Sequence, residues 1–281
     1  MARRVLEVVL RHSRPRFWLY TGGPFLVGYG AGARSLEQFL DPLFFYGLVY
    51  FLVFANVLLY GVNDIFDVDT DVYNPKKGTR EELGLGRART LGAASAASAA
   101  AALPLARGPV EAGLVSLFLF LCVAYSAPPF RLKARPFVDS YTNWLYIVPA
   151  ALGYYMSSGQ LMPPWAFAAG VFWTAGMHAL SAVPDIEADR RAGVSTVATR
   201  LGRRGALLFV FVNWAAASAI LAWRDLLLAP SALYPAVALY LYARCGQVET
   251  WYWRFPFINA AMGAGAFFYA VRDLVLNSAF L

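Results

Sequence analysis

The chain has 281 residues, of which 59% are hydrophobic and 15% are charged, and its formal net charge is +7. Soluble domains average about 25% charged residues, and a soluble chain of this size cannot bury so much apolar surface in one core. The composition therefore excludes a disordered chain and a water-soluble globule, and it indicates a membrane protein.

Nine apolar runs are predicted to cross a bilayer, since about 20 apolar residues are needed for each crossing. Seven of them are separate: 17–33, 42–63, 90–106, 112–130, 205–223, 226–243 and 255–271. The uncharged stretch 140–184 is long enough for two more, because polar residues and paired prolines interrupt it near 157–164. Only short loops remain. We therefore expect an all-α bundle of nine transmembrane helices that forms a single membrane-embedded domain over residues 1–281.

The distribution of Lys and Arg predicts the orientation of these helices. Cytoplasmic loops of membrane proteins are enriched in both residue types. If the N-terminus is cytoplasmic, only Arg34, Arg107, Arg224 and Arg272 of the 24 Lys and Arg residues fall outside. The net positive charge is then explained by the orientation of the helices in the membrane, which argues against nucleic-acid binding. We expect a multi-pass protein of the cell membrane with a cytoplasmic N-terminus.

A first carboxylate cluster, NDIFDVDTD at residues 63–71, follows the second apolar run. An α-helix turns about 100° per residue, so Asp64, Asp67 and Asp71 are expected on one narrow stripe. Like charges on adjacent turns repel each other. The stripe therefore needs compensating cations.

A second cluster, DIEAD at residues 185–189, follows the sixth apolar run. Asp185 and Asp189 are separated by roughly 40° on a helix, whereas Glu187 points away from them. The predicted topology places both clusters at the cytoplasmic face. We expect their carboxylates to share one cavity there.

Carboxylates alone are typical ligands of Mg²⁺, which keeps water molecules and shares substrate phosphates. The lack of Cys and His within the clusters argues against zinc or copper. Cations of the same face surround the site: Lys77 after the first cluster, Arg131 and Lys133 in the loop after the fourth run, and Arg190 after the second cluster. Metal-binding acids beside such cations would bind a diphosphate and stabilise a leaving pyrophosphate.

The spacing NDxxDxxxD at residues 63–71, with DxxxD at 185–189 and nine spans, resembles the UbiA superfamily of intramembrane prenyltransferases. The resemblance covers nearly the whole chain. It implies a helical bundle open to lipid, with two Mg²⁺ ions that bridge the Asp motifs and an isoprenyl diphosphate. It assigns the metal and diphosphate site to Asn63, Asp64, Asp67, Asp71, Asp185 and Asp189.

Many members of the superfamily also carry YxxxK in the loop after the fourth span. Here Tyr125 is followed by Pro129 at the position of that Lys, so Arg131 or Lys133 is expected to replace it. His178 lies about two helical turns before Asp185 and is expected to reach the same cavity. We therefore predict catalytic roles for Asp64, Asp67, Tyr125 and Lys133, and substrate binding by Asn63, Lys77, Arg131, His178 and Arg190.

The segments around the two clusters and the loop after Tyr125 are most similar to the carotenoid elongase subgroup, which adds a prenyl unit to lycopene. The expected donor is dimethylallyl diphosphate or a longer homologue, and the expected acceptor is lycopene or a related carotenoid, with or without addition of water. An aromatic acceptor for quinone, chlorophyll or haem synthesis is the alternative within the superfamily. A cation transporter is the alternative of another class, because acids inside membranes often mark ion pathways.

Overall fold

The computed structural model describes residues 2–73 and 86–278, and these are helical with no β-strand. The α-helices are α1 (Ala2–His12), α2 (Leu19–Gly32), α3 (Pro42–Val49), α4 (Ala55–Phe66), α5 (Val68–Asp71), α6 (Ala88–Ala100), α7 (Pro109–Ser126), α8 (Val138–Tyr141), α9 (Val148–Ser158), α10 (Pro164–Ala182), α11 (Ile186–Arg191), α12 (Val197–Arg224), α13 (Leu233–Ala243), α14 (Val248–Tyr252) and α15 (Phe255–Ser278). Shorter 3₁₀ or π segments are η1 (Pro15–Phe17), η2 (Leu36–Leu40), η3 (Tyr50–Phe54), η4 (Leu103–Leu105), η5 (Leu132–Ala134), η6 (Thr142–Tyr146), η7 (Val183–Asp185), η8 (Leu226–Ala232) and η9 (Cys245–Gln247). The predicted all-α fold class is confirmed.

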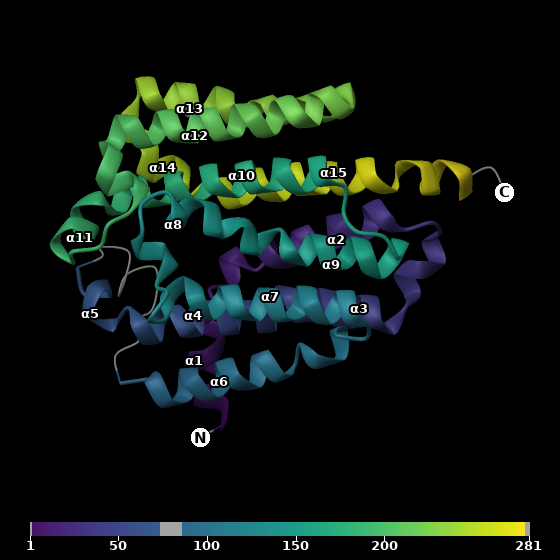
Figure 1. Ribbon diagram of the computed structural model, residues 1–281, viewed down its shortest axis with the longest axis horizontal. Coiled ribbons are helices and arrows are strands. Elements are labelled where there is room, and N and C mark those ends of the chain that lie inside the picture. Colours follow the sequence, from purple (N-terminus) through teal and green to yellow (C-terminus); the bar gives the residue numbers. More distant parts are fainter. Residues whose placement is uncertain (1, 74–85, 279–281) are drawn as a thin grey trace.

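The long helices lie side by side in one bundle (Figure 1). Helix α12 packs against α10 and α13, α2 packs against α9, and α4 packs against α6. The short helices α5 and α11, which carry parts of the two carboxylate clusters, both lie at the left end of the bundle in Figure 1. The fold therefore brings the two clusters to the same end.

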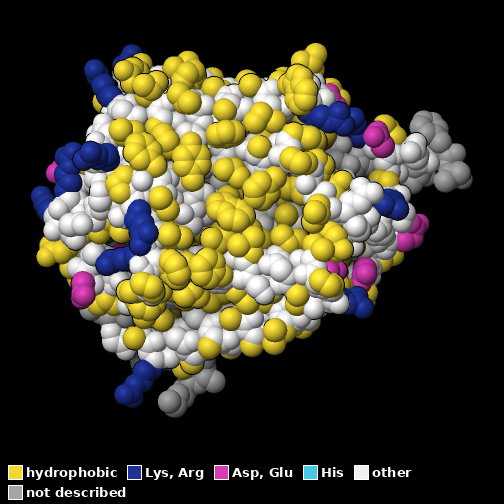
Figure 2. Space-filling model, in the orientation of Figure 1, with side chains coloured by type: hydrophobic (Ala, Val, Ile, Leu, Met, Phe, Trp, Pro, Cys, Tyr) yellow, Lys and Arg dark blue, Asp and Glu magenta, His cyan; other side chains and the backbone are white. Residues whose placement is uncertain are grey.

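The surface is apolar between two charged ends. Hydrophobic side chains cover the middle of the face in Figure 2, whereas Lys, Arg, Asp and Glu gather toward its left and right edges. Large apolar side chains such as Leu208, Leu239 and Phe257 are exposed. Because the hydrocarbon region of a bilayer excludes charge, this pattern is that of a bundle whose helices run across a membrane.

All nine predicted apolar runs are mostly helical within the described residues. Five segments of that part of the chain are long and apolar enough to cross a membrane by themselves: Pro42–Phe66, Pro109–Ser126, Pro164–Arg191, Val197–Arg224 and Leu226–Ala243. Helix α2 has only 14 residues, about 21 Å of helix against a hydrocarbon core of about 30 Å. The number of nine spans therefore stays a prediction.

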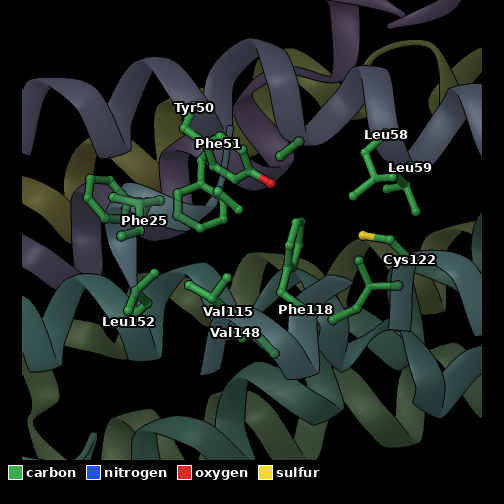
Figure 3. Packing of buried hydrophobic residues seen from close by; sticks show 14 of the residues in the cluster. Phe25, Tyr50, Phe51, Leu58, Leu59, Val115, Phe118, Cys122, Val148 and Leu152 are labelled. Carbon is green, nitrogen blue, oxygen red and sulfur yellow. The ribbon is translucent and has the colours of Figure 1, made fainter. Parts of the chain in front are cut away.

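Aromatic side chains build the interior. Phe25, Phe51 and Phe118 pack together from α2, η3 and α7 (Figure 3), with ring centroids 5.2 Å apart for Phe25–Phe51 and 5.4 Å apart for Phe51–Phe118. A second core surrounds the fully buried Trp214 and joins α10, α12, α13 and α15. These cores fix the helices from which the functional side chains project.

Glycines allow α2 and α9 to approach each other closely. A Cβ atom at Gly28 would lie 2.1 Å from the carbonyl oxygen of Ala150, and one at Gly153 would lie 2.5 Å from that of Phe25. Small residues permit such backbone contact, and this contact replaces the missing hydrophobic driving force between helices in lipid. The α2–α9 pair is therefore intolerant of any side chain at these glycines.

We expect the substitution Gly28→Ala to destabilise the fold by about 1–3 kcal/mol, because the new methyl group overlaps the backbone of α9. Gly113→Ala in α7 is the matched control, since a Cβ there meets no atom within 4 Å. Thermal unfolding of both variants in detergent measures the difference. Equal stability of the two variants would contradict the close approach of α2 and α9.

Candidate active site

A cavity of about 280 Å³ opens where α4, α7 and α10 end near α5 and α11. Eight of the residues selected from the sequence line it: Asn63, Asp67, Asp71, Tyr125, Lys133, His178, Asp185 and Asp189. The structure thus brings carboxylates of both clusters to one cavity. Lys77 lies outside the described residues.

The first cluster is not one continuous helix. Helix α4 ends at Phe66, Asp67 adopts φ −108° and ψ 5°, and α5 begins at Val68. Asp and β-branched residues favour helices weakly, and like charges on adjacent turns repel, which explains the interruption. The break is local, because the Asp71 N–H still donates to the Asp67 carbonyl at 2.7 Å. Asp67 and Asp71 both line the cavity, as expected, whereas Asp64 does not.

Asp64 does not line the cavity and instead contacts side chains of the N-terminal segment. Its carboxylate is 1% exposed; Oδ2 lies 2.7 Å from His12 Nδ1, and Oδ1 accepts a hydrogen bond from Arg14 Nη2 at 2.9 Å. His12 Nε2 in turn lies 3.0 Å from Arg87 Nη1. Both oxygens of Asp64 thus contact basic side chains, and its predicted role as a metal ligand stays a prediction.

Arg14 is a cavity residue that the sequence reasoning missed. It lines the cavity, and its guanidinium carbon lies 4.4 Å from the ring centroid of Tyr60. In the sequence it is one of five arginines before the first span, all interpreted as topology charges. Nothing in the local pattern distinguishes it, because its partner Asp64 lies 50 residues away.

The loop after α7 supplies the cation that the motif lacks. Lys133 Nζ donates to Asp67 Oδ2, whereas Arg131 Nη2 lies 3.9 Å from Asp67 Oδ1 and does not line the cavity. Burial lowers the pKa of the Lys133 ammonium group, although the Asp67 carboxylate favours its charged form. Of the two candidates, Lys133 therefore has the closer contact with the carboxylate cluster.

The second cluster divides as predicted from its helical spacing. Asp185 at the end of η7 and Asp189 on α11 line the cavity. Glu187 is exposed and pairs with Arg190, whose Nη1 lies 3.1 Å from Glu187 Oε1. Arg190 does not line the cavity. The structure therefore does not bring this predicted substrate-binding residue to the site.

Tyr125 and His178, both selected from the sequence, line the cavity, and the buried Asp139, which was not selected, lies behind them. The Tyr125 hydroxyl lies 3.3 Å from His178 Nδ1, and His178 Nε2 lies 3.5 Å from Asp139 Oδ2. Asp139 is fully buried on α8. Asp139 follows the basic loop 131–135 and belongs to neither carboxylate cluster, so only its position in the fold reveals the contact.

The donor atoms of the cavity fit Mg²⁺. Asp67 Oδ1 is buried and makes no hydrogen bond with the described residues. Within those same residues, no group of three His, Cys, Asp or Glu side chains could hold an ion unaided. Mg²⁺ is commonly bound by one or two carboxylates and completed by water and substrate phosphates. The carboxylates of this cavity therefore suit Mg²⁺ that arrives with a phosphate-bearing substrate.

Comparisons with known proteins agree with this chemistry. The model of the UbiA prenyltransferase family matches residues 22–271. A lycopene elongase/hydratase from Haloferax volcanii is 43% identical over 255 residues, which cover 89% of this chain and 84% of the relative. One from Halobacterium salinarum is 40% identical over 263 residues, which cover 89% of this chain and 92% of the relative.

A solved structure shares the fold. The structure of a UbiA homologue from Archaeoglobus fulgidus bound to DMAPP and Mg²⁺ superposes with a TM-score of 0.70 at 23% identity. The superposition covers 94% of this chain and 99% of the Archaeoglobus fulgidus chain. A UbiA homologue from Aeropyrum pernix gives the same TM-score at 22% identity, covering 90% of this chain and 97% of its own.

We expect Asp64→Asn to lower the free energy of unfolding by about 3–5 kcal/mol, because it removes a buried carboxylate charge that Arg14 and the buried His12 ring contact. Asp69→Asn is the matched control, since Asp69 is exposed in the same cluster. Thermal unfolding without Mg²⁺ or diphosphate separates this role from metal binding. A normal stability of Asp64→Asn under those conditions would refute the structural role of the pair.

Proposed function

The chain belongs to the UbiA prenyltransferase family, and we propose that it joins the prenyl group of an allylic diphosphate to a carotenoid such as lycopene. The family and its relatives show that it is a prenyltransferase enzyme. The observation that carries the proposal is one cavity that holds carboxylates of both clusters, with Lys133 in contact with Asp67. Aromatic rings form much of the remaining wall. Such a cavity suits a substrate with a charged diphosphate and an apolar chain.

The donor diphosphate binds at the carboxylate side of the cavity. Asp67, Asp71, Asp185 and Asp189 would hold Mg²⁺, which we propose as two ions, one for each cluster. The bound metal would supply electrostatic stabilisation of the leaving pyrophosphate. Lys133 adds a fixed positive charge, and it stabilises the negative charge that builds on the diphosphate as the C–O bond breaks.

Arg14 and Asn63 complete the donor site. Asp64 and the Tyr60 ring hold the Arg14 guanidinium at the cavity wall. Asn63 also lines the cavity, and its amide donates to Ser126 Oγ at 3.1 Å. Both side chains are thus oriented before the substrate arrives, which lowers the cost of ordering them on binding.

Aromatic rings stabilise the allylic cation. Tyr20, Tyr60, Tyr146, Trp173 and Tyr252 line the cavity. The face of an aromatic ring attracts a positive charge within about 6 Å. The same rings exclude water from the cation until the acceptor carbon attacks it.

The acceptor is proposed from the relatives. Lycopene elongase/hydratases are 39–43% identical to this chain over most of its length. A carotenoid is as apolar as the lipid around the bundle, so it can approach the cavity from the bilayer. By the same similarity we propose that water is added to the elongated product.

The orientation of the site also belongs to this proposal. Lys133 lines the cavity, and Arg131 and Arg135 lie beside it in the same loop. The excess of Lys and Arg on that side supports a cytoplasmic location, because cytoplasmic loops are enriched in both residue types. We therefore propose a cytoplasmic N-terminus and an active site at the cytoplasmic face of a single domain.

Purified protein in proteoliposomes, given radiolabelled dimethylallyl diphosphate and Mg²⁺, tests the acceptor directly. We expect label to enter a lycopene-derived product in reactions with lycopene, and none to enter the product of 4-hydroxybenzoate. Label found only in the aromatic product would overturn the carotenoid assignment and favour the alternative within the family. Chelation of Mg²⁺ by EDTA is expected to abolish the reaction.

We expect Lys133→Met to lower kcat/KM for the allylic diphosphate about 10²-fold or more, because removal of one preorganised charge-stabilising group typically costs that much. Arg135→Met is the matched control in the same loop, since Arg135 is exposed and outside the cavity lining. Steady-state release of pyrophosphate measures both variants. Equal activity of the two would remove Lys133 from the mechanism.

A further inference from the structure

Prenyl addition leaves a problem that the donor site does not solve. When the π electrons of a terminal C=C bond of the acceptor form the new C–C bond, the other alkene carbon becomes a tertiary cation. Addition of water to this cation releases a proton, which needs a proton acceptor in the part of the cavity that holds the prenyl acceptor. This reasoning rests on the proposed function.

Three polar side chains in contact with one another could accept this proton. Tyr125 and His178 line the cavity, and Asp139 lies behind them with no exposed surface. The Tyr125 oxygen is 3.3 Å from His178 Nδ1, and the two rings meet edge to face at 88°. On its other side, His178 Nε2 is 3.5 Å from Asp139 Oδ2. The three groups therefore run from the cavity into the protein.

Asp139 is held by the backbone. Its Oδ2 accepts a hydrogen bond from the N–H of Val197, the first residue of α12, at 2.9 Å. Asp139 Oδ1 and His178 Nε2 make no hydrogen bond with the described residues. A buried carboxylate without a cationic partner is costly. An imidazolium at His178 would provide one, so the site is arranged to stabilise a proton there.

We propose that Tyr125, His178 and Asp139 form a proton relay that accepts the proton of the water that adds to the acceptor cation. Tyr125 and His178 are the catalytic groups, because they face the cavity. Asp139 is a positioning residue, because it acts through His178, whose Nε2 lies 3.5 Å from the Asp139 carboxylate. The same logic orients imidazole bases in other enzymes.

The step balances as follows. The donor C–O bond breaks and its electron pair leaves with the diphosphate, while the acceptor π pair forms the C–C bond. A lone pair of water then forms a C–O bond to the tertiary cation. One proton of that water passes to the Tyr125 oxygen as the Tyr125 proton passes to His178 Nδ1. The imidazolium afterwards releases this proton to solvent, so the relay returns to its starting state.

The location of the relay separates it from the metal site. None of its three residues belongs to either carboxylate cluster, and His178 precedes Asp185 by two turns of helix. The relay should therefore act after ionisation of the donor, and its loss should change the ratio of the products. Without a proton acceptor for water, the cation loses a C–H proton instead, which gives an elongated alkene in place of the alcohol.

The test compares products of Tyr125→Phe, His178→Gln and Asp139→Asn in proteoliposomes with dimethylallyl diphosphate, lycopene and H₂¹⁸O. Mass spectrometry reports the alcohol, its ¹⁸O content and the alkene, and pyrophosphate release is followed in parallel. We expect the rate of alcohol formation to fall about 10²-fold in Tyr125→Phe and His178→Gln, the lower end of general-base effects. Alkene should accumulate, so the ratio of alcohol to alkene should fall well below that of the wild type.

Asp139→Asn preserves the shape of the side chain and tests the positioning role through the same product ratio. We expect it to shift the ratio toward alkene as well. Tyr141→Phe is the matched control, because it removes a hydroxyl from the helix of Asp139 at a residue outside the cavity lining. It should keep the wild-type ratio.

Each other outcome is decisive. A wild-type product ratio in His178→Gln would overturn the relay and leave the proposed prenyl transfer standing. A parallel loss of pyrophosphate and both products would overturn it in favour of a donor-site or structural role for these residues. A wild-type protein that elongates lycopene without ¹⁸O incorporation would also overturn it. A wild-type protein that does not prenylate lycopene would refute the proposed function and the relay together.

Discussion

The structure depends on the compensation of carboxylates at the end of a membrane bundle. Charges taken from water are costly unless they are paired, and two acidic clusters share this end. Two of these carboxylates contact basic side chains: Asp64 contacts His12 and Arg14, and Asp67 contacts Lys133. In the proposed function, the other cavity carboxylates bind metal ions and a diphosphate. The enzyme is thereby organised around its donor.

The bilayer explains where the compensation occurs. Because lipid excludes charge and offers no hydrophobic driving force between helices, the bundle is held by glycine contacts such as Gly28 against Ala150 and by aromatic cores. Charge is then left at the helix ends, where α5 and α11 lie together. The cavity joins this charged end to aromatic rings within the bundle. A charged diphosphate and an apolar chain need such a junction.

Sequence patterns within short segments predicted much of the fold and part of the candidate site. Helical apolar runs, the DxxxD spacing of Asp185 and Asp189, and the proximity of both clusters follow from periodicity and topology. Contacts between distant residues did not. Asp64 shares the motif with Asp67, yet its partners come from the N-terminal segment, which no local pattern connects to it. Asp139 likewise shows its role only beside His178. The break at Asp67 arises from competing local forces too finely balanced for a helical-wheel argument.

The most direct measurement of the central claim is a double-mutant cycle between the two clusters. Asp67→Asn, Asp189→Asn and the double variant would be compared in Mg²⁺-dependent binding of dimethylallyl thiolodiphosphate, an unreactive donor analogue. If both clusters act on one metal–diphosphate unit, the free-energy losses are non-additive, with a coupling of about 1 kcal/mol or more. Losses that add within about 0.5 kcal/mol would show independent sites and contradict the account.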